Sequence, residues 1–297
     1  MEKTLDTIYR RLIRLQSEPL SAGLRNGKTG LLLFMALYSE WKNHGRARNV
    51  SARLLEEVTQ EAYTLPARLM DGSWGILWTL QRLCDKGILE TDDAIRRILH
   101  QLTFSCRTSH MAVPVRVIPE DGLFSEGICT LAQWKDEDAL ERYVTEERLI
   151  GLVDECERLL TMEVPGIHRP KDMPFSLLHS IVWYLQEMVR LKLYPYRAEQ
   201  LLAIAAGLYP ALTDTDAADR YVLASLLPEV ETVYPEKCDN ETFCRILGKV
   251  GFYSLLYNRP ELFRQLWKPV PLSDSLSVET LCSLGYGILQ CKMNTYG

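Results

Sequence analysis

The sequence predicts an all-α protein, an α/α toroid (barrel) of about seven outer–inner helix pairs in a single domain over residues 1–297. Strand signals are nearly absent, and the one candidate, a short hairpin at residues 113–118, is interrupted by Pro114. Apolar residues recur at helical spacing almost everywhere else. The helical segments are of two kinds that alternate along the chain, which indicates an internal repeat.

Segments of the first kind have one apolar face beside a charged face, as an outer helix needs. In one of them Leu149, Leu152, Val153 and Cys156 recur at helical spacing, with acidic residues between them. Thr145 precedes two glutamates, a pattern typical of an N-cap and an acidic first turn. Segments of this design lie around residues 5–15, 54–62, 94–102 and 145–160.

Segments of the second kind are apolar nearly all round, so they must be buried on most sides. They open at small residues, mostly glycines, which permit tight turns and close backbone approach. Seven such segments begin near residues 27, 72, 124, 179, 221, 248 and 284. An amphipathic segment precedes each of them, which makes seven outer–inner helix pairs.

Seven apolar inner helices can be buried in an open solenoid, which needs polar caps, or in a closed ring. The terminal pairs are as apolar as the middle pairs, so closure is favoured. In a closed ring the turns that open the inner helices gather at one end. Their side chains then face a shared central cavity.

Composition excludes several classes of protein. The chain carries 34 basic and 39 acidic residues, a formal net charge of −5, which argues against a nucleic-acid partner. The first eleven residues include acids and no apolar core, so we expect no signal peptide. No apolar stretch approaches the roughly 20 residues that cross a bilayer. We therefore expect a cytoplasmic protein with no membrane partner.

The eight cysteines include no C-x-x-C pair, so zinc ribbons and thioredoxin-type motifs are not expected. Most of them lie in apolar runs, as buried and reduced cysteines do.

A G-x-x-G-[LI] motif that opens the inner helices of a seven-pair toroid resembles the lanthionine synthetase C-like (LanC-like) family. The motif is clearest at Gly23 to Gly30 and at Asp71 to Ile76, and the likeness spans essentially the whole chain. The resemblance implies maturation of a ribosomally synthesised peptide. The typical family member is a zinc-dependent cyclase that adds a peptide cysteine thiol to a dehydrated serine or threonine, which forms a thioether ring.

The family's zinc ligands are a cysteine before a late G-x-x-G and a Cys-His pair before the next one. Here the first position is Ile246, and Cys282 is followed by Ser283 in place of histidine. We therefore expect no family zinc site and no cofactor. A different metal site made from Cys238, Cys244 or Cys282 stays open.

The family's catalytic histidine lies in an L-x-H-G-I turn, which Leu177 to Ile181 resemble with serine in place of glycine. The resemblance thus assigns His179 as a proton donor or acceptor, and Glu120 or Asp121 as its acidic partner. A histidine that only bonds a neighbouring turn is the alternative.

Seven further residues of the repeated turns are candidates for binding a peptide in the cavity, or for its ordinary polar rim. They are Arg25, Lys28, Asp71, Trp74, Glu126, Lys249 and Tyr286.

Three functions fit these observations. The first is a LanC-like protein that binds a peptide in the toroid cavity and has a degenerate cyclase site. The second is a non-catalytic scaffold of the same fold that brings peptide to a partner modifying enzyme. The third is an unrelated α/α toroid that processes glycans, for which Asp71 with Trp74 and Glu126 with Phe124 would supply carboxylates and aromatic platforms.

Overall fold

A computed structural model describes residues 1–16, 20–111, 123–134, 139–161, 172–213, 215–235 and 238–293. Within these ranges the regular structure is helical, with thirteen α-helices, two short 3-10 turns and no strand. The all-α prediction is confirmed. One isolated bridge pairs Ser21 with Gly27. The hairpin predicted at residues 113–118 lies outside the described residues.

The chain divides into two compact units, which are described separately. Unit 1 comprises Met1–Arg116 and Glu236–Gly297, so it contains both ends of the chain. Its helices are α1 (Glu2–Leu15), α2 (Lys28–Lys42), α3 (Gly45–Glu61), α4 (Ser73–Asp85), α5 (Asp93–Met111), α11 (Asn240–Leu256), α12 (Pro260–Leu266) and α13 (Val278–Met293).

Unit 2 comprises Val117–Pro235. Its helices are α6 (Ser125–Gln133), α7 (Ala139–Thr161), α8 (Phe175–Leu191), α9 (Pro195–Leu208) and α10 (Ala217–Leu226). Helix α8 packs against both α9 and α10, and α7 packs against α6 and α9.

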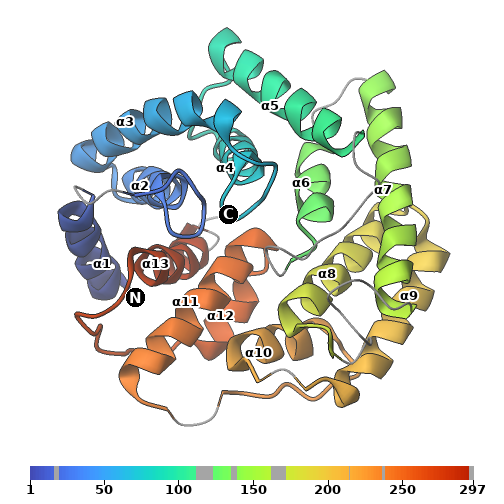
Figure 1. Cartoon of the computed structure of the whole chain (residues 1–297). Coiled ribbons are helices and arrows are strands. Elements are labelled where there is room, and N and C mark those ends of the chain that lie inside the picture. Colours follow the sequence, from blue (N-terminus) through green and yellow to red (C-terminus); the bar gives the residue numbers. More distant parts are fainter. Residues whose placement is uncertain are drawn as a thin grey trace. The chain divides into compact units, whose positions relative to one another are not determined.

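Burial confirms the two kinds of helix. Every residue of α2 from Thr29 to Ser39 is buried. Only Ala47, Val50, Leu54 and Val58 are buried in α3, at the spacing of a single helical face. In unit 1, α2 packs against α3 and α4 and also against α13, which in turn packs against α1, α11 and α12 (Figure 1).

Twelve of the helices follow the predicted alternation, but α11 has no helix before it. The described residues between α10 and α11 form turns and extended chain. Pro228 and Pro235 bracket this stretch, and Val230, Thr232 and Val233 are β-branched. Proline and β-branched residues both disfavour helix, which accounts for the missing partner.

The first two glycine turns repeat closely. Gly27 and Gly72 are the N-caps of α2 and α4. The amide of Lys28 donates to the Ser21 carbonyl at 2.7 Å, and the amide of Ser73, 45 residues later, donates to the Pro66 carbonyl at 2.9 Å. A Cβ at either N-cap would collide with the loop backbone, so only glycine fits.

The predicted start near residue 124 is confirmed, because Phe124 is the N-cap of α6. The segments near residues 179, 248 and 284 do not open helices, which corrects the prediction for them. His179 is the fifth residue of α8, and Gly248 and Gly285 lie well inside α11 and α13. Asp239 caps α11 instead, accepting from the Thr242 amide at 2.9 Å.

Glycine serves a different purpose inside α11 and α13, where it lets the two helices approach closely. A Cβ on Gly248 would lie 3.1 Å from the Thr280 carbonyl oxygen. A Cβ on Gly251 would overlap the Ser283 carbonyl oxygen, and one on Gly287 would overlap the Phe263 ring of α12. These glycines therefore set the packing distance in this part of unit 1.

Replacing Gly251 by alanine is expected to destabilise the protein by about 1–3 kcal/mol, as overpacking does. Elsewhere in a helix the same change stabilises, because glycine costs about 1 kcal/mol relative to alanine. Gly151 of α7 is the control, since nothing lies within 4 Å of a Cβ there. Urea unfolding of G251A and G151A should give shifts of opposite sign. Equal shifts would contradict the packing explanation.

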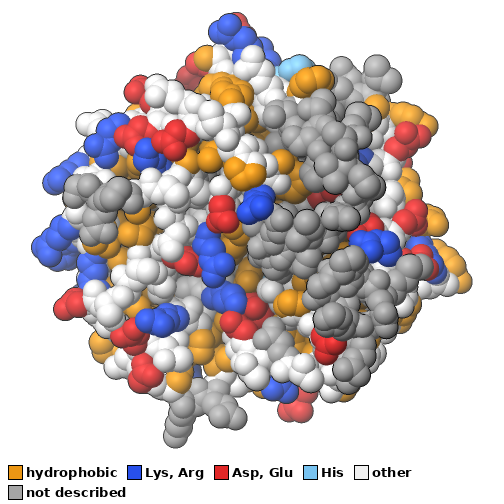
Figure 2. Space-filling view, in the orientation of Figure 1, with side chains coloured by type: hydrophobic (Ala, Val, Ile, Leu, Met, Phe, Trp, Pro, Cys, Tyr) orange, Lys and Arg blue, Asp and Glu red, His pale blue; other side chains and the backbone are white. Residues whose placement is uncertain are grey.

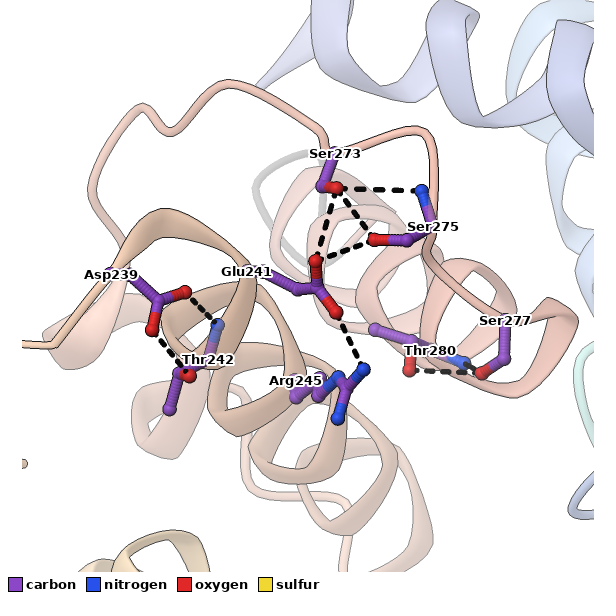
Figure 3. Close-up of polar contacts among 8 residues, drawn as sticks. All are labelled: Asp239, Glu241, Thr242, Arg245, Ser273, Ser275, Ser277 and Thr280. Atoms are coloured by element: carbon purple, nitrogen blue, oxygen red, sulfur yellow. Dashed lines mark hydrogen bonds and ion pairs between the residues drawn. The ribbon is translucent and has the colours of Figure 1, made fainter.

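The loop that leads into α13 is fixed by one carboxylate (Figure 3). Glu241, in the first turn of α11, accepts from the hydroxyls of Ser275 at 2.5 Å and Ser273 at 3.3 Å. It also accepts from Arg245 at 2.5 Å. Arg11 of α1 holds the other side of the loop, donating to the Ser273 carbonyl at 2.6 Å. The Ser275 hydroxyl and the charges of Arg245 lower the pKa of Glu241.

Because its folded-state pKa is lowered, Glu241 stabilises the protein above its unfolded pKa, and this stabilisation disappears as the pH falls through the folded value. Glu241→Gln is therefore expected to be less stable than the wild type at pH 7 and to lose that difference below about pH 4. Thermal unfolding as a function of pH measures this. Glu90→Gln is the control, since Glu90 is exposed. If the difference in stability between the wild type and Glu241→Gln persisted unchanged to pH 3, the ionised Glu241 carboxylate would not be its cause.

Candidate functional site

Helices α2 and α13, whose central residues are all buried, touch each other in unit 1. The Tyr286 hydroxyl of α13 donates to the Gly30 carbonyl of α2 at 2.5 Å. One helical turn along α2, the Phe34 ring lies so close to Gly285 that a Cβ there would overlap it. Tyr286 is 1% exposed. It was predicted to line a cavity, but it lies in the contact between these two helices.

Next to this contact, charged side chains gather around Arg25. Its Nε donates to Glu279 Oε1 of α13 at 2.6 Å. Its backbone amide donates to the Met70 carbonyl at 3.1 Å, which ties the loop before α2 to the loop before α4. Burial disfavours the guanidinium charge, but Glu279, helped by Tyr253 and Asp71, outweighs burial and raises the pKa of Arg25. The residues Arg25, Asp71, Tyr253 and Glu279 are called the Arg25 cluster below.

The Arg25 cluster is open to a ligand. The Arg25 side chain is 51% exposed and that of Glu279 is 30% exposed. Glu279 accepts a hydrogen bond from Nε of Arg25 only. Neither Nη atom of Arg25 therefore has an acceptor among the described residues. A guanidinium held at one edge presents its remaining N–H groups in the geometry that carboxylates match.

Lys249 belongs to α11, which packs against α13. It follows Gly248, which abuts Thr280, the residue after Glu279. Lys249 is partly buried.

Three other predicted cavity residues have structural partners. Lys28 pairs with Glu61 at 2.7 Å and with Glu57 at 3.0 Å, so it ties α2 to α3. Glu126 pairs with Arg148 of α7 at 2.6 Å. The Trp74 ring is only 5% exposed. On the face shown in Figure 2, the coloured acidic and basic side chains are interspersed, as such pairing produces.

His179 lies in unit 2 and is fully buried, at 0% exposure. Its Nε2 lies 3.6 Å from Oδ1 of Asp219, which is itself almost fully buried in the first turn of α10. The acids predicted to face His179, Glu120 and Asp121, lie outside the described residues, and Glu126 of the same segment pairs with Arg148. The neighbouring Ser180 hydroxyl accepts from the Phe124 amide and donates to the Leu177 carbonyl, both at 2.7 Å.

Sequence reasoning missed Asp219, Glu279 and Tyr253. For Asp219 a signal existed, since Asp216 caps α10 and accepts from the Asp219 amide at 3.0 Å. Asp216 and Asp219 form the cap and acidic first turn of an α-helix. Glu279 likewise lies in the first turn of α13, after Ser277, which accepts from the Thr280 amide.

Three cysteines were left open as ligands of a different metal site: Cys238, Cys244 and Cys282. Burial raises the pKa of Cys282 and that of Cys244. The Cys244 thiol lies 3.7 Å from the Pro271 carbonyl oxygen, to which it donates, and Cys238 is exposed. Within the described ranges, no three histidine, cysteine or acidic residues are grouped as metal ligands would be.

No protein-family model, no curated protein and no solved structure matches this chain. None of the helices in the described part of the chain is long and apolar enough to span a membrane.

Replacing His179 by alanine is expected to destabilise the protein by about 3–5 kcal/mol, because Asp219 loses the buried histidine that faces it. Denaturant unfolding measures this, and His100→Ala, an exposed histidine of α5, should change stability by no more than about 0.5 kcal/mol. Combining His179→Ala with Asp219→Asn should cost less than the sum of the two single changes. Strict additivity would show that the two side chains are energetically independent.

Proposed function

We propose that this protein is a LanC-like peptide-binding scaffold: a closed α/α toroid that holds a ribosomally synthesised peptide for a partner modifying enzyme. The peptide enters at the Arg25 cluster. The observation that carries the proposal is the contact between α2 and α13, beside which this cluster lies.

The contact between α2 and α13 supports ring closure. In an open solenoid each repeat contacts only its sequence neighbours, so the first and last repeats lie far apart. Here Tyr286 and Gly30, 256 residues apart in sequence, share a buried hydrogen bond. Arg11 and Asp274 add an ion pair of 2.7 Å between the two chain ends.

The Arg25 cluster supports peptide binding. It combines a half-exposed guanidinium with the carboxylates of Asp71 and Glu279 and with the Tyr253 phenol. A peptide offers the complementary groups, since each of its residues carries a carbonyl acceptor and all but proline carry an N–H donor. Arg25 would donate hydrogen bonds to a peptide carboxylate or carbonyl, and the acids would accept hydrogen bonds from peptide N–H groups.

The scaffold is favoured over the cyclase because His179, at the family's catalytic position, is enclosed with Asp219 and not exposed to a ligand. A general base must reach the proton that it removes. The glycan-processing alternative loses support as well, because Trp74 and Phe124 are buried and do not present their faces to a sugar.

A random peptide library displayed on phage tests the binding proposal. Peptides enriched on the wild type and labelled with fluorescein are expected to bind Arg25→Ala roughly tenfold more weakly, since a hydrogen bond to a charged group contributes about 1.5–3 kcal/mol. Lys28→Ala is the matched control, because Lys28 is three residues away but is occupied by Glu57 and Glu61. Equal loss in both variants, or no enrichment at all, would refute the Arg25 cluster as the site.

The absence of cyclase chemistry is tested with a synthetic peptide that contains one cysteine and one dehydroalanine. Thioether formation leaves the mass unchanged but consumes the thiol, so alkylation by iodoacetamide followed by mass spectrometry reports it. We expect the same rate of thiol loss with and without the protein. If the protein accelerated the loss of the thiol and His179→Ala abolished this acceleration, the cyclase function would be favoured instead.

A further inference from the structure

The end of α4 carries two basic side chains whose surroundings differ from those of most other partly buried cations in the molecule. Arg82 and Lys86 are four residues apart, in the last turn and at the C-cap of α4, and both are partly buried. Residues at this spacing lie on the same side of a helix. Arg82 and Lys86 are called the Arg82 pair below.

Among the described residues, Arg82 hydrogen-bonds only to a neutral side chain. Its Nη2 donates to Asn258 Oδ1 at 2.8 Å, in an exposed position just after α11. The same oxygen is 3.5 Å from Gln290 Nε2 of α13. Arg82 Nε is buried and has no acceptor among the described residues. An arginine cannot shed its proton to relieve this situation.

Lys86 makes no hydrogen bond or ion pair within the described part of the chain. Burial lowers the pKa of Lys86, and the positive charge of Arg82 lowers it further, while Asp85 acts in the opposite direction. Burial likewise lowers the pKa of Arg82. The positive charges of the two side chains thus repel each other, and no carboxylate of the described residues lies within ion-pair distance of either.

Other partly buried basic residues meet a carboxylate directly. Ion pairs of this kind occur at Arg11, Lys28, Lys42, Arg148, Arg158 and Arg197. The negative end of the α4 dipole favours cations in the last turn, and it explains in part why Arg82 and Lys86 are tolerated there. However, a dipole does not supply acceptors for the N–H groups of Arg82 and Lys86, and buried donors without acceptors are costly.

We propose that Arg82 and Lys86 form a binding site for an oxyanion, a carboxylate or a phosphate group of a ligand. The oxyanion would lie between the exposed edge of the Arg82 guanidinium and the Lys86 ammonium, and would accept hydrogen bonds from both. This site lies at the opposite end of α4 from Asp71, about 20 Å away by the length of the helix, so it does not depend on the Arg25 cluster or on the proposed function.

Inorganic phosphate and acetate, each titrated at constant ionic strength, are the probes, and the melting temperature is the readout. Both should raise the melting temperature of the wild type in a saturable manner. Lys86→Gln should weaken the response at least roughly tenfold, because a charge-assisted contact is lost. If phosphate acts at lower concentration than acetate, the ligand group is a phosphate; the reverse order indicates a carboxylate.

The unliganded variant supplies a second readout. Lys86→Gln removes the repulsion with Arg82, so without added anion it should melt no lower than the wild type. Arg96→Gln is the control, because Arg96 is exposed and paired with Asp93 at 3.0 Å, and it should keep the full response to anions. Identical responses of the wild type, K86Q and R96Q would show only a general salt effect and overturn the proposal. The lack of any saturable response in the wild type would do the same.

Discussion

The arrangement of unit 1 depends on how closely its buried helices approach one another. Helices apolar on nearly all sides must be covered on nearly all sides, and glycine is the residue that allows their backbones to come near enough. Gly30 and Gly285 permit the contact of α2 with α13, while Gly248, Gly251 and Gly287 permit that of α11 with α13 and α12. These helix contacts also position the polar groups beside them, namely the Tyr286 hydroxyl and the pair of Arg25 with Glu279.

Much of the fold could be predicted from the sequence because burial leaves a clear periodic signal. The apolar run of α2 and the single apolar face of α3 were both recognised, and the structure confirms them. Helix starts were less predictable, because glycine has two uses. At residues 27 and 72 it caps a helix, whereas at residues 251 and 287 it lies in the middle of one. The motif alone does not distinguish these uses, although Asp239 ahead of α11 does.

The residues of the candidate site could be predicted only where they belong to the repeated glycine turns. Arg25 and Asp71 belong to the two best-formed turns and do lie near each other. Glu279 and Tyr253 belong to α13 and α11. The sequence predicted later starts for both helices, so the position of these two side chains beside Arg25 was not foreseen. For His179 the resemblance pointed to Glu120 or Asp121, which lie outside the described residues, whereas Asp219 in the first turn of α10 was not foreseen as a neighbour.

The distinction between satisfied and open charges gives the clearest guide to function in this molecule. Lys28, the first residue of α2, is only three residues after Arg25, yet two carboxylates contact Lys28, whereas one carboxylate contacts a single edge of Arg25. In α4, Trp74 at the start of the helix is buried. Arg82 and Lys86 near its end are cations that meet no carboxylate among the described residues. A cation held in place with donors to spare contributes less to stability than a paired one. A ligand that supplies the missing acceptors best explains such a cation, and two of these, Arg25 beside Asp71 and the Arg82 pair, lie near opposite ends of α4.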